Sequence, residues 1–211
     1  ACINAWAKSD SGAHGAQRAT QILRDMLQTN VKPTVVTFNT VIHAWAKSGV
    51  VSGWKKAETI MHTMRQCGVE PNERTYTTLM DCWSKCASEI PGAAHRALEL
   101  LTHMTKSASL RPNCVAYSTV IDAFARSREP NKALMAVQIL KRMRAISSSD
   151  PRATPSLVTY NSVFNSCATS YYYRRSSNHT TTSYHNPTKR CTAKKKVLSD
   201  DNPIMTIPLV H

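Results

Sequence analysis

One short stretch of this chain recurs at nearly regular intervals. It is clearest at residues 35–49 and returns, with substitutions, at 73–85, 114–126 and 157–168. Equivalent aromatic residues are separated by 38 to 43 positions, and a period of this length is typical of arrays of stacked units. Each unit of such a solenoid buries its apolar face against its neighbours, so no single central core is needed. The function is therefore expected to be a property of the repeat.

Each copy begins with apolar residues at helical spacing. The positions follow i, i+3, i+4 and i+7, which places them on one face of an α-helix, whereas the alternation by two of a strand is absent. Thr37, Thr75 and Thr159 stand just before the aromatic residue and are predicted to cap or begin these helices. The four stripes are Phe38, Val41, Ile42 and Trp45; Tyr76, Leu79, Met80 and Trp83; Tyr117, Val120, Ile121 and Phe124; and Tyr160, Val163, Phe164 and Cys167.

A second stripe with the same spacing accompanies the first, and a proline closes each unit. Proline cannot continue a helix and forces the preceding residue toward extended backbone. The sequence therefore predicts an all-α fold, an α-solenoid of stacked helix-turn-helix repeats with about nine helices. The second stripes are Ala19, Ile22, Leu23 and Met26; Ala57, Ile60, Met61 and Met64; Ala97, Leu100, Leu101 and Met104; and Ala136, Ile139, Leu140 and Met143, and the prolines are Pro33, Pro71, Pro112 and Pro155.

The repeat pattern divides the chain into a solenoid and a tail. After residue 170 the pattern stops, and residues 171–211 form a low-complexity basic tail that we expect to be disordered. We interpret this tail as sequence outside the native repeats, such as the product of a reading-frame error. The chain starts inside a repeat and without Met, so we expect a fragment of a protein with more repeats. The solenoid comprises units 1–34 (partial), 35–72, 73–113, 114–156 and 157–170 (partial).

The charge, the cysteines and the lack of long apolar runs limit which partners and cofactors are expected. The formal net charge is +14 and the pI is near 9.7, a balance that favours a polyanion. The seven cysteines are odd in number and show no metal-ligand spacing, so neither a zinc site nor a disulfide framework is indicated. No apolar run approaches the length of a membrane span. We expect no cofactor, no metal, no membrane partner and no small-molecule substrate.

These motifs resemble the pentatricopeptide repeat family over residues 1 to about 170. The first helix is similar to a Val-Thr-Tyr-Asn-Thr-Leu-Ile opening, the second helix has Ala-x6-Met, and Gly68-Val-Glu-Pro-Asn72 matches the closing signature. The tetratricopeptide repeat also packs helix pairs, but its Trp-Leu-Gly-Tyr arrangement is absent. The units depart from the family pattern in length, with 38, 41 and 43 residues.

The resemblance implies sequence-specific binding of single-stranded RNA in a mitochondrion or plastid, with one base read per repeat. Two polar residues of each unit are implied to read the base, one after the opening aromatic residue and one after the closing proline. The implied reading pairs are Asn39 with Asn72, Thr77 with Asn113, and Ser118 with Ser156, while Thr34 and Asn161 are halves of incomplete pairs. The residues implied to flank the bases are Val36, Arg74, Val115 and Val158.

The reading pairs predict a short preferred sequence. An amide group can donate a hydrogen bond, whereas an ionised carboxylate only accepts. Adenine and cytosine present a bare ring nitrogen, so Asn72 and Asn113 are expected to favour those bases. By the family resemblance, Asn39 implies a pyrimidine and Thr77 a purine, which gives 5′-C-A. A weakly specified base for Ser118 and Ser156, and then a pyrimidine for Asn161, are expected to follow.

Two other interpretations fit parts of the sequence. Short polar residues beside a proline and a helix start are also ordinary capping and turn residues. A helical scaffold that binds protein partners through the solenoid surface is therefore the alternative function. We do not expect an enzyme, because the sequence has neither an Asp cluster for a metal-dependent nuclease nor the His-x-Glu and Cys-x-x-Cys pair of a deaminase.

Overall fold

The structure confirms the predicted α-solenoid. It is a computed structural model that describes residues 3, 5, 12–29 and 31–179, with side chains described as far as residue 170. All secondary structure in these ranges is helical. The helices are α2 (Gly12–Gln28), α3 (Val35–Lys47), α4 (Gly53–Gln66), α5 (Glu73–Cys86), α6 (Ala93–Lys106), α7 (Cys114–Arg126), α8 (Lys132–Ser147), the 3-10 turn η1 (Pro151–Ala153) and α9 (Leu157–His179).

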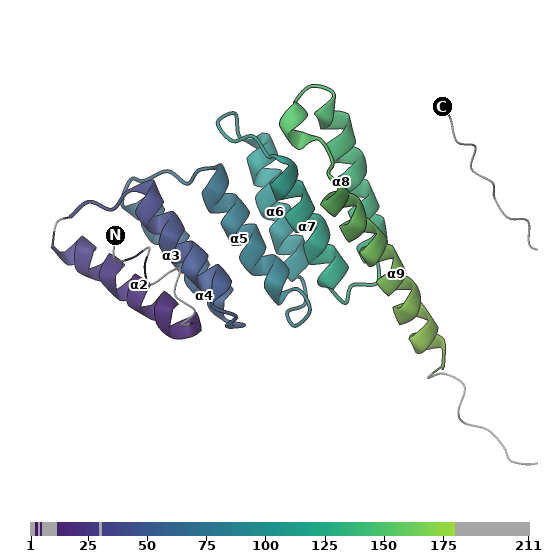
Figure 1. The fold of residues 1–211 in the computed structure, drawn as a ribbon, viewed down its shortest axis with the longest axis horizontal. Coiled ribbons are helices and arrows are strands. Elements are labelled where there is room, and N and C mark those ends of the chain that lie inside the picture. Colours follow the sequence, from purple (N-terminus) through teal and green to yellow (C-terminus); the bar gives the residue numbers. More distant parts are fainter. Residues whose placement is uncertain (1–2, 4, 6–11, 30, 180–211) are drawn as a thin grey trace, which may run out of the picture.

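The helices form two layers that curve. The first helices of the units, α3, α5, α7 and α9, contact one another in series and run in the same direction (Figure 1). The second helices, α2, α4, α6 and α8, pack against first helices, and within the described part of the chain their backbones stand further apart from one another. Between α4 and α6, the long side chains of Glu58 and Arg96 still meet over 3.1 Å. Since one layer is closed and the other is splayed, the array bends with the first helices on its inner face.

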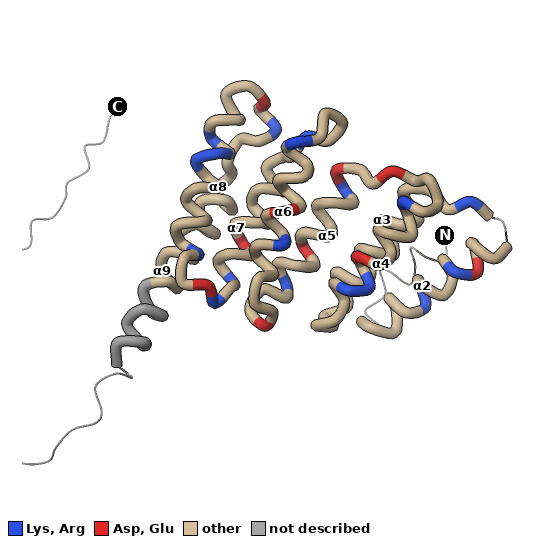
Figure 2. The backbone as a smooth tube through the Cα atoms, turned by 180° about the vertical axis from the view of Figure 1, so that it is seen from behind, with Lys and Arg blue, Asp and Glu red and all other residues tan. Residues whose placement is uncertain are grey.

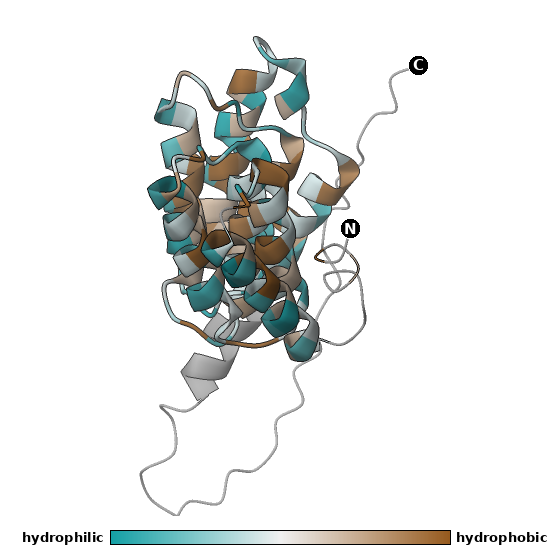
Figure 3. Ribbon diagram, turned by 90° about the vertical axis from the view of Figure 1, so that its left-hand side faces the viewer, coloured by the Kyte–Doolittle hydropathy of each residue, from teal (hydrophilic) through white to brown (hydrophobic). Residues whose placement is uncertain are grey.

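The core lies between the two layers. Hydrophobic residues gather along the middle of the array, and hydrophilic residues lie outside, as the end-on view in Figure 3 shows. The first three predicted stripes of the first helices are buried throughout. Ala19, Ala57, Ala97 and Ala136, which head the second stripes, are fully buried, so the small side chain allows the two layers to approach closely.

The helix starts differ from the prediction by a few residues. Thr34, Asn72 and Asn113 are the N-caps, and their side-chain oxygens accept from the main-chain N–H of the third helical residue. Thr37 and Thr75 occupy that third position, and their hydroxyls accept from the N–H of the cap. These threonines therefore complete a reciprocal capping box, and the prediction that they begin the helices was wrong.

The fourth stripe is also not buried as predicted. Val163 is buried, but Tyr160, Phe164 and Cys167 are exposed on α9. No second helix within the described residues follows α9 to cover them, and α9 itself continues past residue 170 to His179. From residue 180 onward, the predicted disordered tail lies outside the described residues. Burial of a stripe therefore depends on the neighbouring helix as well as on its spacing.

Two equivalent positions test this dependence. Ile121 on α7 is 0 % exposed, whereas Phe164, the equivalent residue on α9, is 68 % exposed. We expect Ile121→Ala to lower the free energy of unfolding by about 2–5 kcal/mol, because it leaves a cavity. Phe164→Ala should change it by less than about 0.5 kcal/mol. Urea unfolding followed by circular dichroism measures both, and equal losses would contradict the packing described here.

Candidate nucleic-acid interface

The first reading pair comes together across a repeat boundary. Asn39 lies on α3 and Asn72 caps α5, and these two helices are adjacent. The Nδ2 group of Asn39 donates to Oδ1 of Asn72 over 3.2 Å. Asn39 is only 6 % exposed, whereas Asn72 is exposed. Asn72 therefore presents its amide group to solvent, and Asn39 supports it from the protein side.

A buried threonine links the two members of this pair. Thr75 is 0 % exposed, and its Oγ1 donates to Oδ1 of Asn39 over 2.6 Å. The main-chain N–H of Asn72 donates to the same hydroxyl, and the N–H of Thr75 donates to Oδ1 of Asn72, each over 3.1 Å. The capping box of α5 and the reading pair thus form one hydrogen-bonded cluster.

The second pair lacks such a link. Oδ1 of Asn113 accepts from the N–H of Ala116 over 3.1 Å, which caps α7. Thr77 instead donates its hydroxyl to the carbonyl of Glu73 in its own helix, over 2.8 Å. Ala116 stands where α5 has Thr75, so no hydroxyl is available between Thr77 and Asn113.

The third pair is linked in the same way as the first. Thr159 is 0 % exposed, and its Oγ1 lies 2.7 Å from Oγ of Ser118 and 3.2 Å from Oγ of Ser156. Cys114 joins this cluster, with its sulfur 3.9 Å from Ser118 and from Thr159. Burial alone would raise the pKa of Cys114, but hydrogen bonds from Ser156, Thr159 and Ser118 lower it. The site is thus rich in hydroxyl donors.

The two residues of the incomplete pairs, Thr34 and Asn161, lie where the complete pairs have their members. Thr34 caps α3, where its hydroxyl lies 3.2 Å from that of Thr37. Asn161 is exposed on α9, as the first member of a pair whose second member no described residue supplies.

The flanking residues form an exposed row beside the pairs. Val36, Val115 and Val158 stand at the second position of α3, α7 and α9, and Val36 is 73 % exposed. Arg74 occupies the same position on α5 and is also exposed. Large apolar side chains left in water at equivalent places of successive units indicate a contact surface. The repeat thus presents one polar pair and one flanking side chain to the same region.

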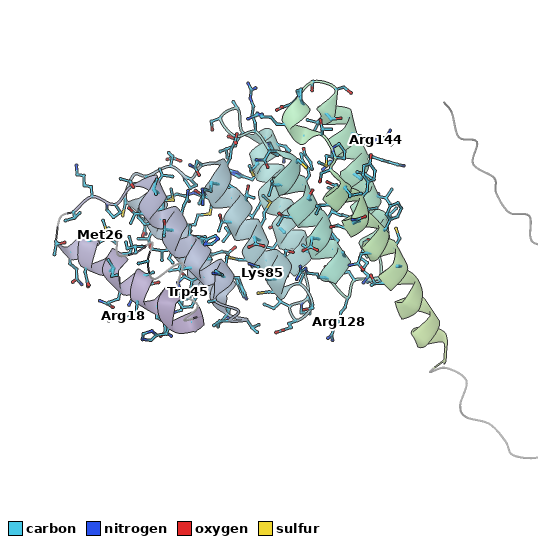
Figure 4. The ribbon with its side chains drawn as sticks, viewed as in Figure 1. Arg18, Met26, Trp45, Lys85, Arg128 and Arg144 are labelled. Carbon is cyan, nitrogen blue, oxygen red and sulfur yellow. The ribbon has the colours of Figure 1, made fainter. Side chains whose placement is uncertain are left out.

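Basic residues form another row on the inner face. Lys47, Lys85 and Arg126 each follow the flanking residue of their helix by eleven positions, and all three are exposed. Lys85 lies beside α3 (Figure 4), where its Nζ donates to the carbonyl of Ala46 over 3.0 Å and pairs with Asp81 over 2.8 Å. Arg126 pairs similarly with Asp122 over 2.7 Å. This row was not among the residues predicted from the family resemblance, although its regular spacing is visible in the sequence.

Basic side chains lie near His43 on α3. Burial, and then the charges of Lys85 and Arg74, lower the pKa of His43, which Asp81 opposes. Lys and Arg are spread along the whole array (Figure 2), in keeping with the net charge. Such a surface attracts anions along its length.

In the described part of the chain, no group of three or more His, Cys, Asp or Glu side chains is arranged to hold a metal ion. Among the helices described, none combines the length and apolarity needed to cross a membrane.

Two family models match the repeats of this chain. A family model described as the PPR repeat family matches residues 33–85, and one described as the pentatricopeptide repeat domain matches residues 13–48 and 99–169. A search of curated proteins gave no match. The crystal structure of the pentatricopeptide repeat protein PPR10 from maize is similar over 88 % of this chain, with 18 % identity and a TM-score of 0.34. The chain spans 33 % of that protein's length.

The capping role of the reading residues can be tested separately from any ligand. Asn113→Asp keeps a side-chain oxygen for the N–H of Ala116 and places a negative charge at a helix N-terminus, so stability should be unchanged or higher. Asn113→Ala removes that acceptor and should cost about 1 kcal/mol. Urea unfolding of both variants measures this, and equal destabilisation would contradict the cap assignment.

Proposed function

Because the chain belongs to the pentatricopeptide repeat family, whose helical-repeat members typically bind RNA, we propose that it binds single-stranded RNA sequence-specifically, one base per repeat. The observation that carries this proposal is the recurrence of one placement of polar residues. At three successive repeat boundaries, two short polar residues from adjacent helices lie beside an exposed flanking side chain. In that arrangement the polar pair can hydrogen-bond to the edge of a base, and the flanking side chain can pack against its face.

The exposed amide of Asn72 supports recognition of cytosine or adenine. Its Oδ1 is engaged by Thr75 and Asn39, and Nδ2 makes no hydrogen bond to any described residue. The outward group is therefore a donor, which suits a bare ring nitrogen. Asn113 has the same orientation, since its Oδ1 is held by Ala116. We infer a preference for 5′-C-A across the pairs that contain Asn72 and Asn113.

The flanking row supports contact with the base faces. Val36, Val115 and Val158 can pack against a base, and the planar guanidinium of Arg74 can stack on one. Stacking contributes about 1–3 kcal/mol per base in proteins that bind single strands. A few repeats of this kind bind a short RNA but select it only modestly.

The basic row supports contact with the phosphates. Lys47, Lys85 and Arg126 follow the flanking residues by eleven positions, or about 16 Å along a helix. They lie on the same inner face as the reading pairs. We infer that they neutralise the RNA backbone, which makes affinity fall as salt rises without itself specifying sequence.

The cellular role follows from the family alone. We infer a function in RNA processing, stability or translation inside a mitochondrion or plastid, without catalytic activity of the repeats themselves. The family is generally non-enzymatic, and its members are generally organellar.

Protein binding is the second candidate, and the outer face would serve it. A groove of about 300 Å³ lies between α6 and α8, and its apolar lining includes Leu98, Leu101, Ile139 and Ile146. A partner side chain could enter there because the second helices are splayed. This groove lies in the layer opposite the reading pairs, so variants of the two surfaces separate the two functions.

Base preference decides between these functions. Replacing Asn72 by Asp should shift preference from C toward U by about tenfold, because a carboxylate accepts from the ring N–H of uracil and cannot donate. Asn113→Asp should shift preference from A toward G in the same way. Titration of the 211-residue chain with short RNAs that differ at one base measures both shifts.

A matched control separates base reading from charge. Asn165→Asp adds the same negative charge at an exposed position of α9 outside the pairs, so it should weaken all RNAs equally. Unchanged preferences in both Asn72→Asp and Asn113→Asp would refute the assignment of the reading pairs.

A further inference from the structure

The three reading pairs differ in how firmly they are held. The difference lies at the third position of the helix that follows each pair, which is Thr75 on α5, Ala116 on α7 and Thr159 on α9. All three positions are fully buried. Where the residue is threonine, its hydroxyl bonds to both members of the pair. Where it is alanine, the members share no hydrogen bond among the described residues.

Thr75 fixes the orientation of both side-chain amides in the pair of Asn39 and Asn72. The main-chain N–H of Thr75 can only donate, so it holds Oδ1 of Asn72 inward and turns Nδ2 outward. Asn39 donates to that same oxygen, which directs its own Oδ1 toward Thr75. The hydroxyl of Thr75 donates its proton to Oδ1 of Asn39 over 2.6 Å. Both amide groups are therefore fixed before any base arrives.

In the pair of Thr77 and Asn113, the following helix holds only Asn113. The N–H of Ala116 still holds Oδ1 of Asn113, but the hydroxyl of Thr77 is engaged by Glu73 in its own helix. Among the residues that the structure describes, no buried polar group connects Thr77 to Asn113. Each of the two can therefore adjust to a base without moving the other.

We propose that this buried third-position residue is a positioning residue that sets how strictly the preceding pair discriminates between bases. For a pair with given side chains, threonine makes the discrimination stricter than alanine does, whereas the side chains of the pair decide which base is preferred and how many groups can read it. The proposal rests on the proposed RNA-binding function and deepens it, because it assigns a specificity role to residues that do not face the RNA.

The physical basis is preorganisation. A pair fixed in advance loses less side-chain freedom on binding the matching base. It also cannot rotate to satisfy a mismatched base, which leaves a polar group unpaired. A pair without the link can rotate, so matched and mismatched bases differ less in affinity.

Removal of the hydroxyl tests the first half of the proposal. We expect Thr75→Val to reduce the preference of the Asn39 and Asn72 pair for its base by about fivefold, the size of one net hydrogen bond. Thr75→Ser keeps the hydroxyl and should restore the preference. The readout is the ratio of affinities for short RNAs that differ only at the base read by this pair, and this ratio does not depend on the active fraction of the protein.

Addition of the hydroxyl tests the second half. Ala116→Thr should sharpen the preference of the Thr77 and Asn113 pair by about fivefold, since threonine is accommodated at the equivalent buried positions of α5 and α9. Ala116→Ser is the smaller variant and should act in the same direction if the threonine methyl disturbs packing.

Thr37 supplies the matched control. It makes the same capping bonds to Thr34 and has no hydrogen bond to another helix in the described part of the chain. Thr37→Val should therefore lower stability through the lost capping bond to Thr34, but leave the base preferences of the pairs that contain Asn72 and Asn113 unchanged. If the wild-type chain shows base preference and Thr75→Val preserves it, the positioning role is overturned and RNA reading stands. If the wild-type chain prefers no base at these pairs, the proposed function falls, and the positioning role falls with it.

Discussion

The N-terminal cap of each first helix is the interaction on which this structure depends. Proline ends the preceding segment, and the next residue adopts extended backbone, with φ −102° and ψ 179° at Asn72. Its side-chain oxygen must turn inward to satisfy a main-chain N–H that would otherwise lack a partner. The remaining polar group of the side chain is then forced outward. One hydrogen bond thus starts the helix and also directs the other polar group of the side chain toward solvent.

Because the cap needs only an oxygen, the exposed polar group of the capping residue can differ between repeats without a change in fold. Asn, Asp, Ser and Thr are all good N-caps, because each supplies an oxygen at the same place. They differ in what remains exposed: an amide donor, a carboxylate acceptor or a hydroxyl. Substitution among them preserves the helix start, whereas replacement by an aliphatic residue removes cap and recognition together. The reading residues Thr34, Asn72, Asn113 and Ser156 all belong to this set.

The sequence predicts the solenoid well because apolar spacing directly encodes burial. The buried stripes of α3, α5 and α7 follow from periodicity alone, and so do the alanines between the layers. The exposure of Phe164 could not be predicted from spacing, because it depends on which helix packs beside α9. The contacts within the candidate interface could likewise not be predicted where they depend on how two helices pack. The family resemblance supplied the reading positions, but the buried link through Thr75 depends on the contact between α3 and α5, which local sequence does not specify.

The reading unit is offset from the structural unit. Asn39 belongs to one repeat, but its partner Asn72 caps the helix of the next, and Thr75 lies inside that helix. No repeat can therefore form its pair alone, because the cap and the linking hydroxyl require the following helix to be folded. A solenoid folds through interfaces between neighbours, so the loss of one interface should weaken the pair before it as well as the packing after it. The proposed base recognition and the stacking of repeats would in this way depend on the same set of contacts, which face the inner surface on one side and the core on the other.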